Sequence, residues 1–305
     1  MSKINICERL VRPRQKADVV LDTDAYNEID DQFAIAYMLS AKEKLAVQSI
    51  YAAPFFNSRS NGPEDGMIKS YDEIMRLLEL SGNSELKNSV YHGSTKYLTD
   101  ENTPVESAAA QNLVSLAMNH TPENPLYIIA IGAITNIASA LLIEPKISER
   151  IVIVWLGGHA LHWPDTKEFN MFQDIAAARV VFDSGAPVVQ LPCMGVVSAF
   201  CTTGPELTHW LRGKNPLCDY LLKSTVEEAE SYASGQAWSR PIWDVTAVGW
   251  LLDENEVFMK DRLIPSPIPQ YDGHYSYDEN RHHIKYVWHI DRDALFNDLF
   301  TRIAK

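Results

Sequence analysis

Five acidic side chains stand within ten residues of one another near the start of the sequence, directly after a short apolar run. Two of them, Asp22 and Asp24, lie two residues apart at the end of a predicted strand, so we expect their side chains to leave it on the same face. Another two, Asp30 and Asp31, begin a predicted apolar helix, whose dipole favours negative charge at that end. The fifth is Glu28. The spacing predicts that several carboxylates meet where the strand ends.

This acidic cluster contains no compensating charge in the sequence, since no lysine or arginine occurs between Lys16 and Lys42. Carboxylates at close range repel one another strongly unless a positive charge lies among them. A hard divalent cation with oxygen ligands is the simplest compensation, and calcium or magnesium fits better than zinc. The alternative is that Asp30 only caps the helix while the other acids are solvated loop residues.

Three later segments hold a comparable position, at the end of a predicted strand or at the start of a predicted helix. Residues 131–136 form a strand-to-helix turn, where backbone carbonyls can reach a ligand. The Glu-Phe-Asn sequence of residues 168–170 follows the Gly-Gly-His sequence of residues 157–159, which ends another predicted strand. Trp243 and Asp244 precede an apolar helical segment, so Asp244 is either a site residue or a plain N-cap.

Short apolar runs rich in valine and isoleucine alternate with longer segments of helical periodicity. The predicted strands are residues 19–21, 47–51, 126–131, 151–156 and 187–191, and the predicted helices are residues 31–39, 68–80, 105–118, 136–142 and 175–182. This alternation predicts an α/β fold with a mostly parallel central sheet and helices on both faces. Ligands of such sheets bind at the carboxyl ends of the strands. We expect residues 265–277 to form a long loop and residues 1–305 to form a single domain.

The composition restricts the kinds of partner. The chain has 27 basic and 40 acidic residues, a net charge of −13, whereas nucleic acids and anionic membranes both require a basic face. Residues 126–143 have the length of a membrane span, but the polar residues in their middle favour a strand, a loop and a helix. We therefore expect a small-molecule ligand, and neither a nucleic-acid partner nor a membrane partner.

The cysteines indicate a reducing compartment. Cys7, Cys193, Cys201 and Cys218 show neither CxxC spacing nor the density of a disulfide framework, so we expect reduced thiols. The first residues lack the apolar segment of a signal peptide. Both observations lead us to expect a cytoplasmic protein.

Taken in order, these motifs resemble those of the nucleoside hydrolases, the calcium-dependent N-ribohydrolases that cleave the bond between base and ribose. The shared motifs are a strand ending in Asp-x-Asp with a following Asp-Asp, then Gly-x-x-Thr-Asn, Gly-Gly, Glu-Phe-Asn and a late aspartate. The similarity runs from about Val19 to Asp244, with a weaker similarity over residues 287–303. The resemblance implies a Rossmann-like nucleoside hydrolase fold, a nucleoside substrate and a homo-oligomer.

The resemblance also implies a set of metal ligands. Calcium would be held by the carboxylates of Asp24, Asp31 and Asp244 and by the backbone carbonyl of Ile131. Asp24 would, in addition, take a proton from the water molecule that the metal binds. Such a water is already oriented and is more acidic than bulk water.

The remaining motifs would bind the ribose. By the resemblance, Asp30 binds ribose hydroxyls, Glu168 and Asn170 bind the 5′ end of the ribose, and Asn57 lies at the floor of the pocket. Glycosidic cleavage passes through an oxocarbenium-like state, which nearby carboxylates stabilise. The acidic residues therefore fit the chemistry as well as the metal.

Three positions depart from the family pattern. Five residues separate Asp24 from Asp30 where the family usually has three, so two residues must bulge, which leaves the role of Asn27 open. His162 stands where the family has an asparagine, and it either binds a ribose hydroxyl or is an ordinary loop histidine. Trp243 stands where pyrimidine-preferring and broad-specificity members have a histidine, as in purine-preferring members. Its indole either stacks on the base or belongs to the core.

From the motifs and the resemblance together we predict a purine-leaning ribonucleoside hydrolase that uses calcium. One alternative keeps the site but changes the substrate to a modified nucleoside or another N-riboside. The other is a non-catalytic, calcium-stabilised nucleoside-binding protein. The presence of Asp24, Asp31 and Asp244 favours an enzyme, since binding alone does not require an activated water.

Overall fold

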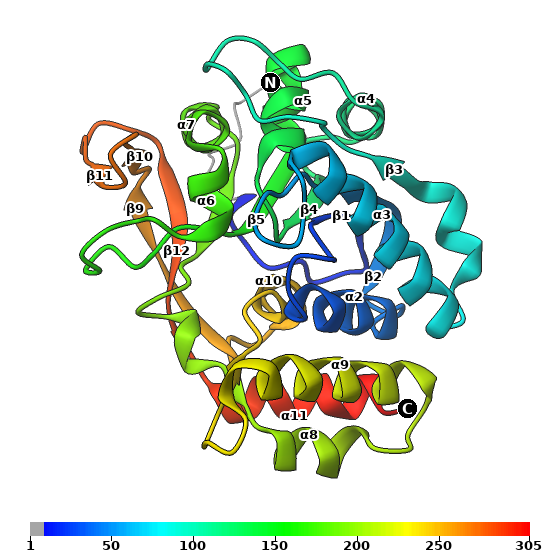
Figure 1. Cartoon of the computed structure of the whole chain (residues 1–305). Helices are drawn as coiled ribbons and strands as arrows, with labels where there is room; N and C mark the ends of the chain where they lie inside the picture. Colours follow the sequence, from blue (N-terminus) through cyan, green and yellow to red (C-terminus); the bar gives the residue numbers. More distant parts are fainter. Residues whose placement is uncertain (1–8) are drawn as a thin grey trace.

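An eight-stranded sheet forms the centre of the protein (Figure 1). In the computed structural model, which describes residues 9–305, the strand order is β3-β2-β1-β4-β5-β6-β12-β9. Neighbouring strands are parallel except for β9, which runs antiparallel to β12. The strands are β1 (Ala17–Thr23), β2 (Leu45–Ala52), β3 (Val90–His92), β4 (Leu126–Ala130), β5 (Ile151–Leu156), β6 (Val188–Leu191), β9 (Met259–Pro265) and β12 (His283–Ile290). The predicted α/β fold is confirmed.

Helices cover both faces of the sheet (Figure 1). One face carries α4 (Ala108–Met118), α5 (Thr135–Ile143) and α7 (Ile175–Asp183), and the other carries α2 (Asp30–Ser40), α3 (Pro63–Leu80) and α10 (Val245–Leu252). Strand β1 shows how the sequence produces this arrangement. Val20 packs into the core on the side of α4 and α5, whereas Val19 and Leu21 pack into the core on the side of α2. Successive strand side chains point to opposite faces, so an apolar run buries both.

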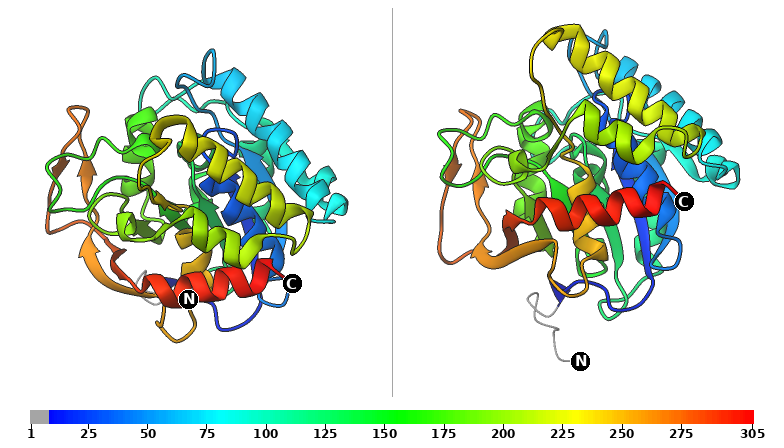
Figure 2. Two further views of the ribbon diagram at one scale, coloured as in Figure 1. Left: turned by 60° about the horizontal axis from the view of Figure 1, so that its bottom comes forward. Right: turned by 90° about the horizontal axis from the view of Figure 1, so that it is seen from below.

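Three further helices form an additional layer beyond α2 (Figure 2). They are α8 (Gly204–Leu211), α9 (Pro216–Ala233) and α11 (Arg292–Ile303). Stacked aromatic rings hold α11 in place: Phe296 lies 3.8 Å from Phe200 and Phe300 lies 5.7 Å from Trp210, measured between ring centroids. The sequence pattern predicted none of these three helices.

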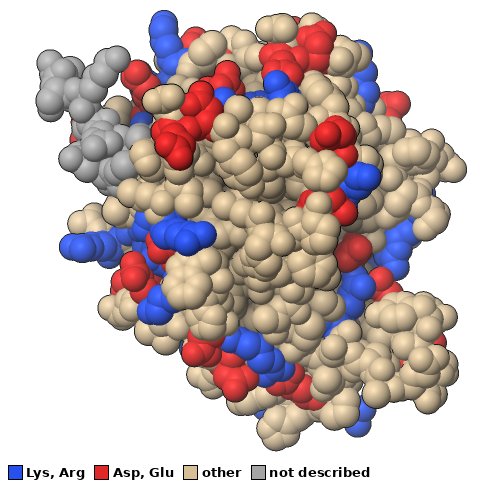
Figure 3. Space-filling view, turned by 90° about the vertical axis from the view of Figure 1, so that its left-hand side faces the viewer, with Lys and Arg blue, Asp and Glu red and all other residues tan. Residues whose placement is uncertain are grey.

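The expectation of a long loop at residues 265–277 was wrong. Within this segment β10 pairs antiparallel with β11, and each strand has two residues. Strands this short leave no periodic pattern in a sequence. The other short elements are η1 (Ser84–Ser89), η2 (Pro145–Glu149), α6 (Phe169–Gln173), η3 (Val197–Ala199), β7 (Cys201–Thr202), β8 (Arg240–Pro241), β10 (Ile268–Pro269) and β11 (Tyr275–Ser276). The β10–β11 hairpin belongs to the side of the molecule seen in Figure 3, where charged side chains of both signs surround a largely uncharged centre.

The segment of membrane-span length folds as predicted, as strand β4, a turn and helix α5. No helix within residues 9–305 is both long enough and apolar enough to cross a membrane. The three cysteines in this part of the chain, Cys193, Cys201 and Cys218, are free thiols. Cys7 lies outside the described residues.

Candidate active site

The carboxyl ends of four adjacent strands, β1, β4, β5 and β6, open onto one cavity of about 220 Å³. Each strand contributes a residue at or just beyond its end, namely Asp24, Ile131, Leu156 and Cys193. The starts of helices α2 and α10 add Asp30, Asp31, Trp243 and Asp244. The remaining lining residues are Asn27, Glu28, His159, Lys167, Glu168, Phe169, Asn170 and Met194. The cavity therefore lies where ligands of parallel α/β sheets bind.

Four buried carboxylates form one side of this cavity, which we call the acidic wall: Asp24, Asp30, Asp31 and Asp244. One oxygen each from Asp30, Asp31 and Asp244 lie within 4.8 Å of one another. Helix capping does not explain these side chains, because Asp244 occupies the N-cap position of α10 without accepting a capping hydrogen bond. Helix α2 likewise begins at Asp30 without a side-chain cap. Because these carboxylates are buried, they are not solvated loop residues either, which was the other part of the alternative interpretation.

The acidic wall is electrostatically unfavourable without a cation. Burial is the main cause that raises the pKa of all four carboxyl groups, to about 7 for Asp30 and well above the usual range for Asp24, Asp31 and Asp244. Repulsion by the neighbouring carboxylates raises these pKa values further. Asp24 Oδ2 and Asp30 Oδ1 are buried and have no hydrogen-bond partner. Closely spaced oxygens with unused lone pairs fit a hard cation, so this cluster could bind a metal ion.

The structure brings all four predicted metal ligands to the cavity: Asp24, Ile131, Asp31 and Asp244. It also shows one difference in detail. The closest carboxylate trio contains Asp30, which was predicted to bind ribose, and does not contain Asp24. Asp30 is therefore placed to serve as a further metal ligand.

The Asp-x-Asp and Thr-Asn motifs also have structural roles. Asp22 does not line the cavity, and its carboxylate accepts a hydrogen bond of 2.7 Å from Asn136 Nδ2. Asn136 Oδ1 in turn accepts hydrogen bonds from the backbone and the hydroxyl of Ser94, at 2.7 and 2.8 Å. Thr135 donates to Asp174 at 2.7 Å. Asp22, Thr135 and Asn136 therefore connect neighbouring segments of the fold and do not line the cavity, in contrast to Asp24.

Another part of the cavity lining, which we call the loop wall, contains the predicted residues Glu168 and Asn170, together with His159. The Glu168 carboxylate accepts hydrogen bonds from the backbone N–H groups of Gly158, Asn170 and Met171, at 2.8, 2.8 and 2.9 Å. Burial nevertheless raises its pKa to about 7. Asn170 Nδ2 donates to the carbonyl of Leu156 at 3.1 Å. The polar groups of this wall are therefore fixed by the protein itself.

A turn accommodates the two additional residues between Asp24 and Asp30. The backbone N–H of Asn27 donates to the carbonyl of Asp24 at 2.7 Å, and the Asn27 side chain lines the cavity. Asn57 does not line the cavity, but its Nδ2 donates to Asn27 Oδ1 at 2.6 Å. Asn57 thus lies behind Asn27 and orients it.

An ion pair fixes the same loop from the other side. Arg240 of β8 contacts Glu28 at 2.6 Å and Glu228 of α9 at 3.6 Å. Arg59 contacts Glu228 at 3.4 Å and so extends the network. The loop between Asp24 and Asp30 is therefore connected to segments distant in the sequence.

The structure separates His162 from the cavity. It lines a different hollow, together with Arg262 and Trp288, and the histidine that borders the cavity is His159. Trp243 lines the cavity and is also packed against the hydrophobic core. The indole is therefore part of the hydrophobic packing and is also accessible to a ligand in the cavity.

Comparison with known proteins agrees with this geometry. The sequence profile of the inosine-uridine preferring nucleoside hydrolases matches residues 19–297. The chain belongs to this family. The pyrimidine-specific ribonucleoside hydrolase RihA of Citrobacter koseri is 24% identical over 73% of this chain and 76% of its own length. The inosine-uridine preferring nucleoside hydrolase of Leishmania major is 26% identical over 53% of this chain and 52% of its own length.

Solved nucleoside hydrolases have the same fold. The purine-preferring ribonucleoside hydrolase from Gardnerella vaginalis is 21% identical, with a TM-score of 0.75 over 94% of this chain and 98% of that one. This nucleoside hydrolase is therefore an enzyme that cleaves N-ribosyl bonds.

Several lining residues of this nucleoside hydrolase were missed in the sequence. Cys193 and Met194 follow β6, so the rule that ligands bind at strand ends could have found them. His159 directly follows the Gly-Gly motif and could have been found in the same way. Lys167 had no signal other than its place beside Glu168.

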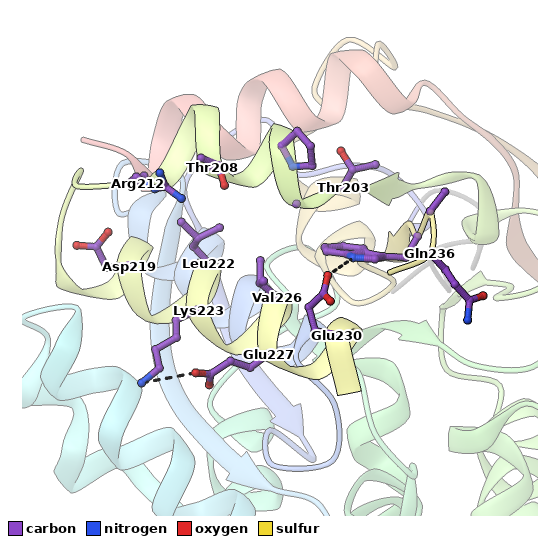
Figure 4. A pocket seen from close by; sticks show the side chains of 14 residues that line it. Thr203, Thr208, Arg212, Asp219, Leu222, Lys223, Val226, Glu227, Glu230 and Gln236 are labelled. Atoms are coloured by element: carbon purple, nitrogen blue, oxygen red, sulfur yellow. Dashed lines mark hydrogen bonds and ion pairs between the residues drawn. The ribbon is translucent and has the colours of Figure 1, made fainter. Parts of the chain in front are cut away.

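A larger hollow, of about 800 Å³, lies between α8 and α9 (Figure 4). Four of its side chains form two pairs: Trp238 Nε1 donates to Glu230 at 3.0 Å, and Lys223 Nζ lies 3.8 Å from Glu227. None of its lining residues, all within the described part of the chain, has a buried polar atom without a partner. The acidic cavity is smaller but holds the unsatisfied carboxylates, so it is the candidate active site of the nucleoside hydrolase.

Proposed function

We propose that this nucleoside hydrolase cleaves ribonucleosides, with a preference for purines, into free base and ribose, using calcium at the acidic wall. The observation that carries the proposal is the buried, unpartnered Asp24 Oδ2 beside the carboxylate trio of Asp30, Asp31 and Asp244. Calcium suits this site because its donors are oxygens and calcium accepts several carboxylates at once.

In the proposed reaction, the oxygen of water forms a bond to C1′ of the ribose while the bond from C1′ to the base nitrogen breaks. Asp24 accepts a proton from the water, since Oδ2 has no other partner in the protein. The bonding electrons leave with the base, which takes up a proton from solvent, and Asp24 later returns its proton to solvent. The carboxylates of the acidic wall stabilise the positive charge that develops on the ribose. A bound calcium ion would compensate the repulsion among these carboxylates and acidify a water molecule beside them.

The size of the cavity supports a binding mode in which the ribose lies inside the cavity and the base lies at its mouth. A volume of about 220 Å³ is below the roughly 300–1,000 Å³ of pockets that enclose an entire drug-sized ligand. The fixed polar groups of Glu168 and Asn170 suit hydroxyl groups at the 5′ end of the ribose.

The proposed purine preference depends on Trp243. Its indole lines the cavity and offers a flat apolar face, which covers more of a bicyclic base than of a monocyclic one. The similar structure from Gardnerella vaginalis is of a purine-preferring enzyme, whereas the relative from Citrobacter koseri is pyrimidine-specific. The preference therefore has to be measured for this chain.

The decisive experiment incubates the calcium-loaded protein with a panel of purine, pyrimidine and modified nucleosides and measures free ribose. We expect release from inosine and guanosine at higher kcat/KM than from uridine and cytidine. Release from a modified nucleoside or another N-riboside alone would change the substrate class. Binding without release from any member of the panel would indicate a nucleoside-binding protein.

A further inference from the structure

The backbone around His159 is fixed on both sides. Gly158 adopts a φ of +75°, which glycine tolerates far better than other residues, and this turns the chain after β5. Its carbonyl accepts a hydrogen bond of 2.9 Å from the backbone of Cys193. Ala160 donates to the carbonyl of Met194, also at 2.9 Å. His159 is therefore held against the segment that follows β6, at the border of the acidic cavity.

The imidazole of His159 is also oriented. The backbone N–H of Met194 donates to Nδ1 at 3.3 Å, so Nδ1 carries no proton and the neutral ring carries its proton on Nε2. Partial burial lowers the pKa of His159, which favours the neutral ring. Trp163 contacts the imidazole edge-on, with ring centroids 6.1 Å apart. Among residues 9–305, the bond to Nδ1 is the only hydrogen bond of this imidazole, so Nε2 is available to a ligand.

His159 lies beside the residues that the proposed function assigns to the 5′ end of the ribose. The backbone N–H of its neighbour Gly158 donates to Glu168, and Glu168 is the N-cap of the helix that contains Asn170. The Asn170 amide nitrogen donates one of its two hydrogens to Leu156. An oxygen of the substrate with free lone pairs requires a donor, which an ionised Glu168 does not supply and which His159 Nε2 does.

We propose that His159 is a substrate-binding residue that donates a hydrogen bond from Nε2 to the 5′-oxygen of the ribose. This inference rests on the proposed function for the identity of the ligand. His159 then recognises the 5′-hydroxyl as a hydrogen-bond acceptor, while the hydroxyl donates a hydrogen bond to Glu168. A substrate that lacks the 5′-oxygen loses this interaction and no other interaction of His159.

The test combines three variants of His159 with two substrates, inosine and 5′-deoxyinosine, on the calcium-loaded protein. H159F removes both ring nitrogens. H159N keeps an acceptor for the Met194 N–H but does not reach the position of Nε2, whereas H159Q places an amide near that position. H162F is the matched control, three residues further along the same loop and outside the cavity.

We expect H159F and H159N to lower kcat/KM for inosine about tenfold, the order expected for one hydrogen bond to a neutral group. The same variants should leave kcat/KM for 5′-deoxyinosine within about twofold of wild type. H159Q should recover most of the activity on inosine, and H162F should change neither substrate. Long-range ¹H–¹⁵N NMR of the wild-type protein should show an unprotonated Nδ1 on His159.

Equal losses on both substrates would overturn the assignment to the 5′-oxygen, as would a protonated Nδ1. If H159F does not fold, as judged by thermal melting, H159N and H159Q still provide the loss and the recovery. If the wild-type protein releases no ribose from any nucleoside, the proposed function fails. Calorimetric binding of ribose and 5-deoxyribose then tests His159 separately, and an equal effect of H159N on both sugars would overturn its role.

Discussion

The two walls of the cavity differ in how their polar groups are satisfied before any ligand binds. In the acidic wall, buried oxygens of Asp24 and Asp30 have no partner and the carboxylates repel one another. In the loop wall, Glu168 accepts three backbone hydrogen bonds, Asn170 donates one, and Met194 orients His159. Both walls are polar, yet of the two only the acidic wall has buried oxygens without a hydrogen-bond partner in the described part of the chain.

This difference indicates that the two walls have different roles. Buried charges without partners cost free energy, so the acidic wall gains most from a bound cation. Polar groups that are fixed in advance lose little entropy when a substrate binds, so the loop wall sets the position of the ribose. Changes to the acidic wall should affect metal binding and chemistry, and changes to the loop wall should affect recognition.

Metal removal should give the largest effect, because it removes the positive charge that compensates all the carboxylates of the acidic wall. Prolonged chelation should abolish ribose release and lower the melting temperature by roughly 5–10 °C, since a ligand at 100 times its Kd contributes about 2.7 kcal/mol. Added calcium should restore both quantities. Calorimetry and a ribose assay, with elemental analysis of the same sample, measure the effect. Full activity in a sample proven metal-free would contradict the proposed role of this wall.

Asp24→Asn should lower kcat at least a few hundredfold while the protein remains folded. The substitution keeps the side-chain size, removes the group that accepts the proton and relieves repulsion within the acidic wall. Steady-state ribose release and a melting curve measure both effects. Asp18→Asn is the control, since Asp18 lies near the opposite end of the same strand and pairs with Gln48 outside the cavity. Near-normal activity of the Asp24 variant would remove Asp24 from the mechanism.

The acidic wall was largely visible in the sequence because it is local. Asp24, Asp30 and Asp31 lie within eight residues, and a strand and a helix place them together. The loop wall depends on contacts between distant segments. The position of His159 after a strand could have been noticed in the sequence, but the pairing of Gly158 and Ala160 with residues 193 and 194, which holds His159 at the cavity, could not. The resemblance to the family pointed instead to His162, which lines a different hollow.

The elements of the fold were likewise predictable only where their signal is local in the sequence. The buried strands β1, β2, β4, β5 and β6 were predicted, because apolar runs mark them. The edge strand β9 and its neighbour β12 were missed, since exposed charged residues such as Lys260 interrupt the apolar pattern. The role of Asn136 was likewise hidden, because its partners Asp22 and Ser94 come together only in the folded sheet.

Trp243→Ala tests the residue beside the acidic wall that is proposed to contact the base. If the indole stacks on purines in the transition state, kcat for inosine should fall about tenfold, more than KM rises, and the purine-to-pyrimidine ratio of kcat/KM should narrow. Trp243→Phe, which keeps an aromatic face, should retain most of the ratio. Truncation could instead open a cavity in the core and shift Asp244. Rates that fall equally for all nucleosides would mean that Trp243 acts by packing.

Asn57→Ala should give the smallest effect, a rise in KM of a few-fold with little change in kcat, because it removes one neutral hydrogen bond behind the acidic wall. Two roles of Asn57 predict different couplings to Asn27. If Asn57 acts only by orienting Asn27, Asn57→Ala should have no further effect in a protein that already carries Asn27→Ala. If Asn57 binds the substrate directly, as the family resemblance implied, the two effects should add. Asn61→Ala is the control, since Asn61 is exposed in the same loop and pairs with Asp65.

The geometry favours the first result, in which Asn57 acts only through Asn27, because Asn27 lines the cavity whereas Asn57 contacts Asn27 and does not line the cavity. Additive effects would instead mean that the loop opens far enough for Asn57 to reach the substrate, and that the acidic wall is less fixed than the ion pair between Glu28 and Arg240 indicates.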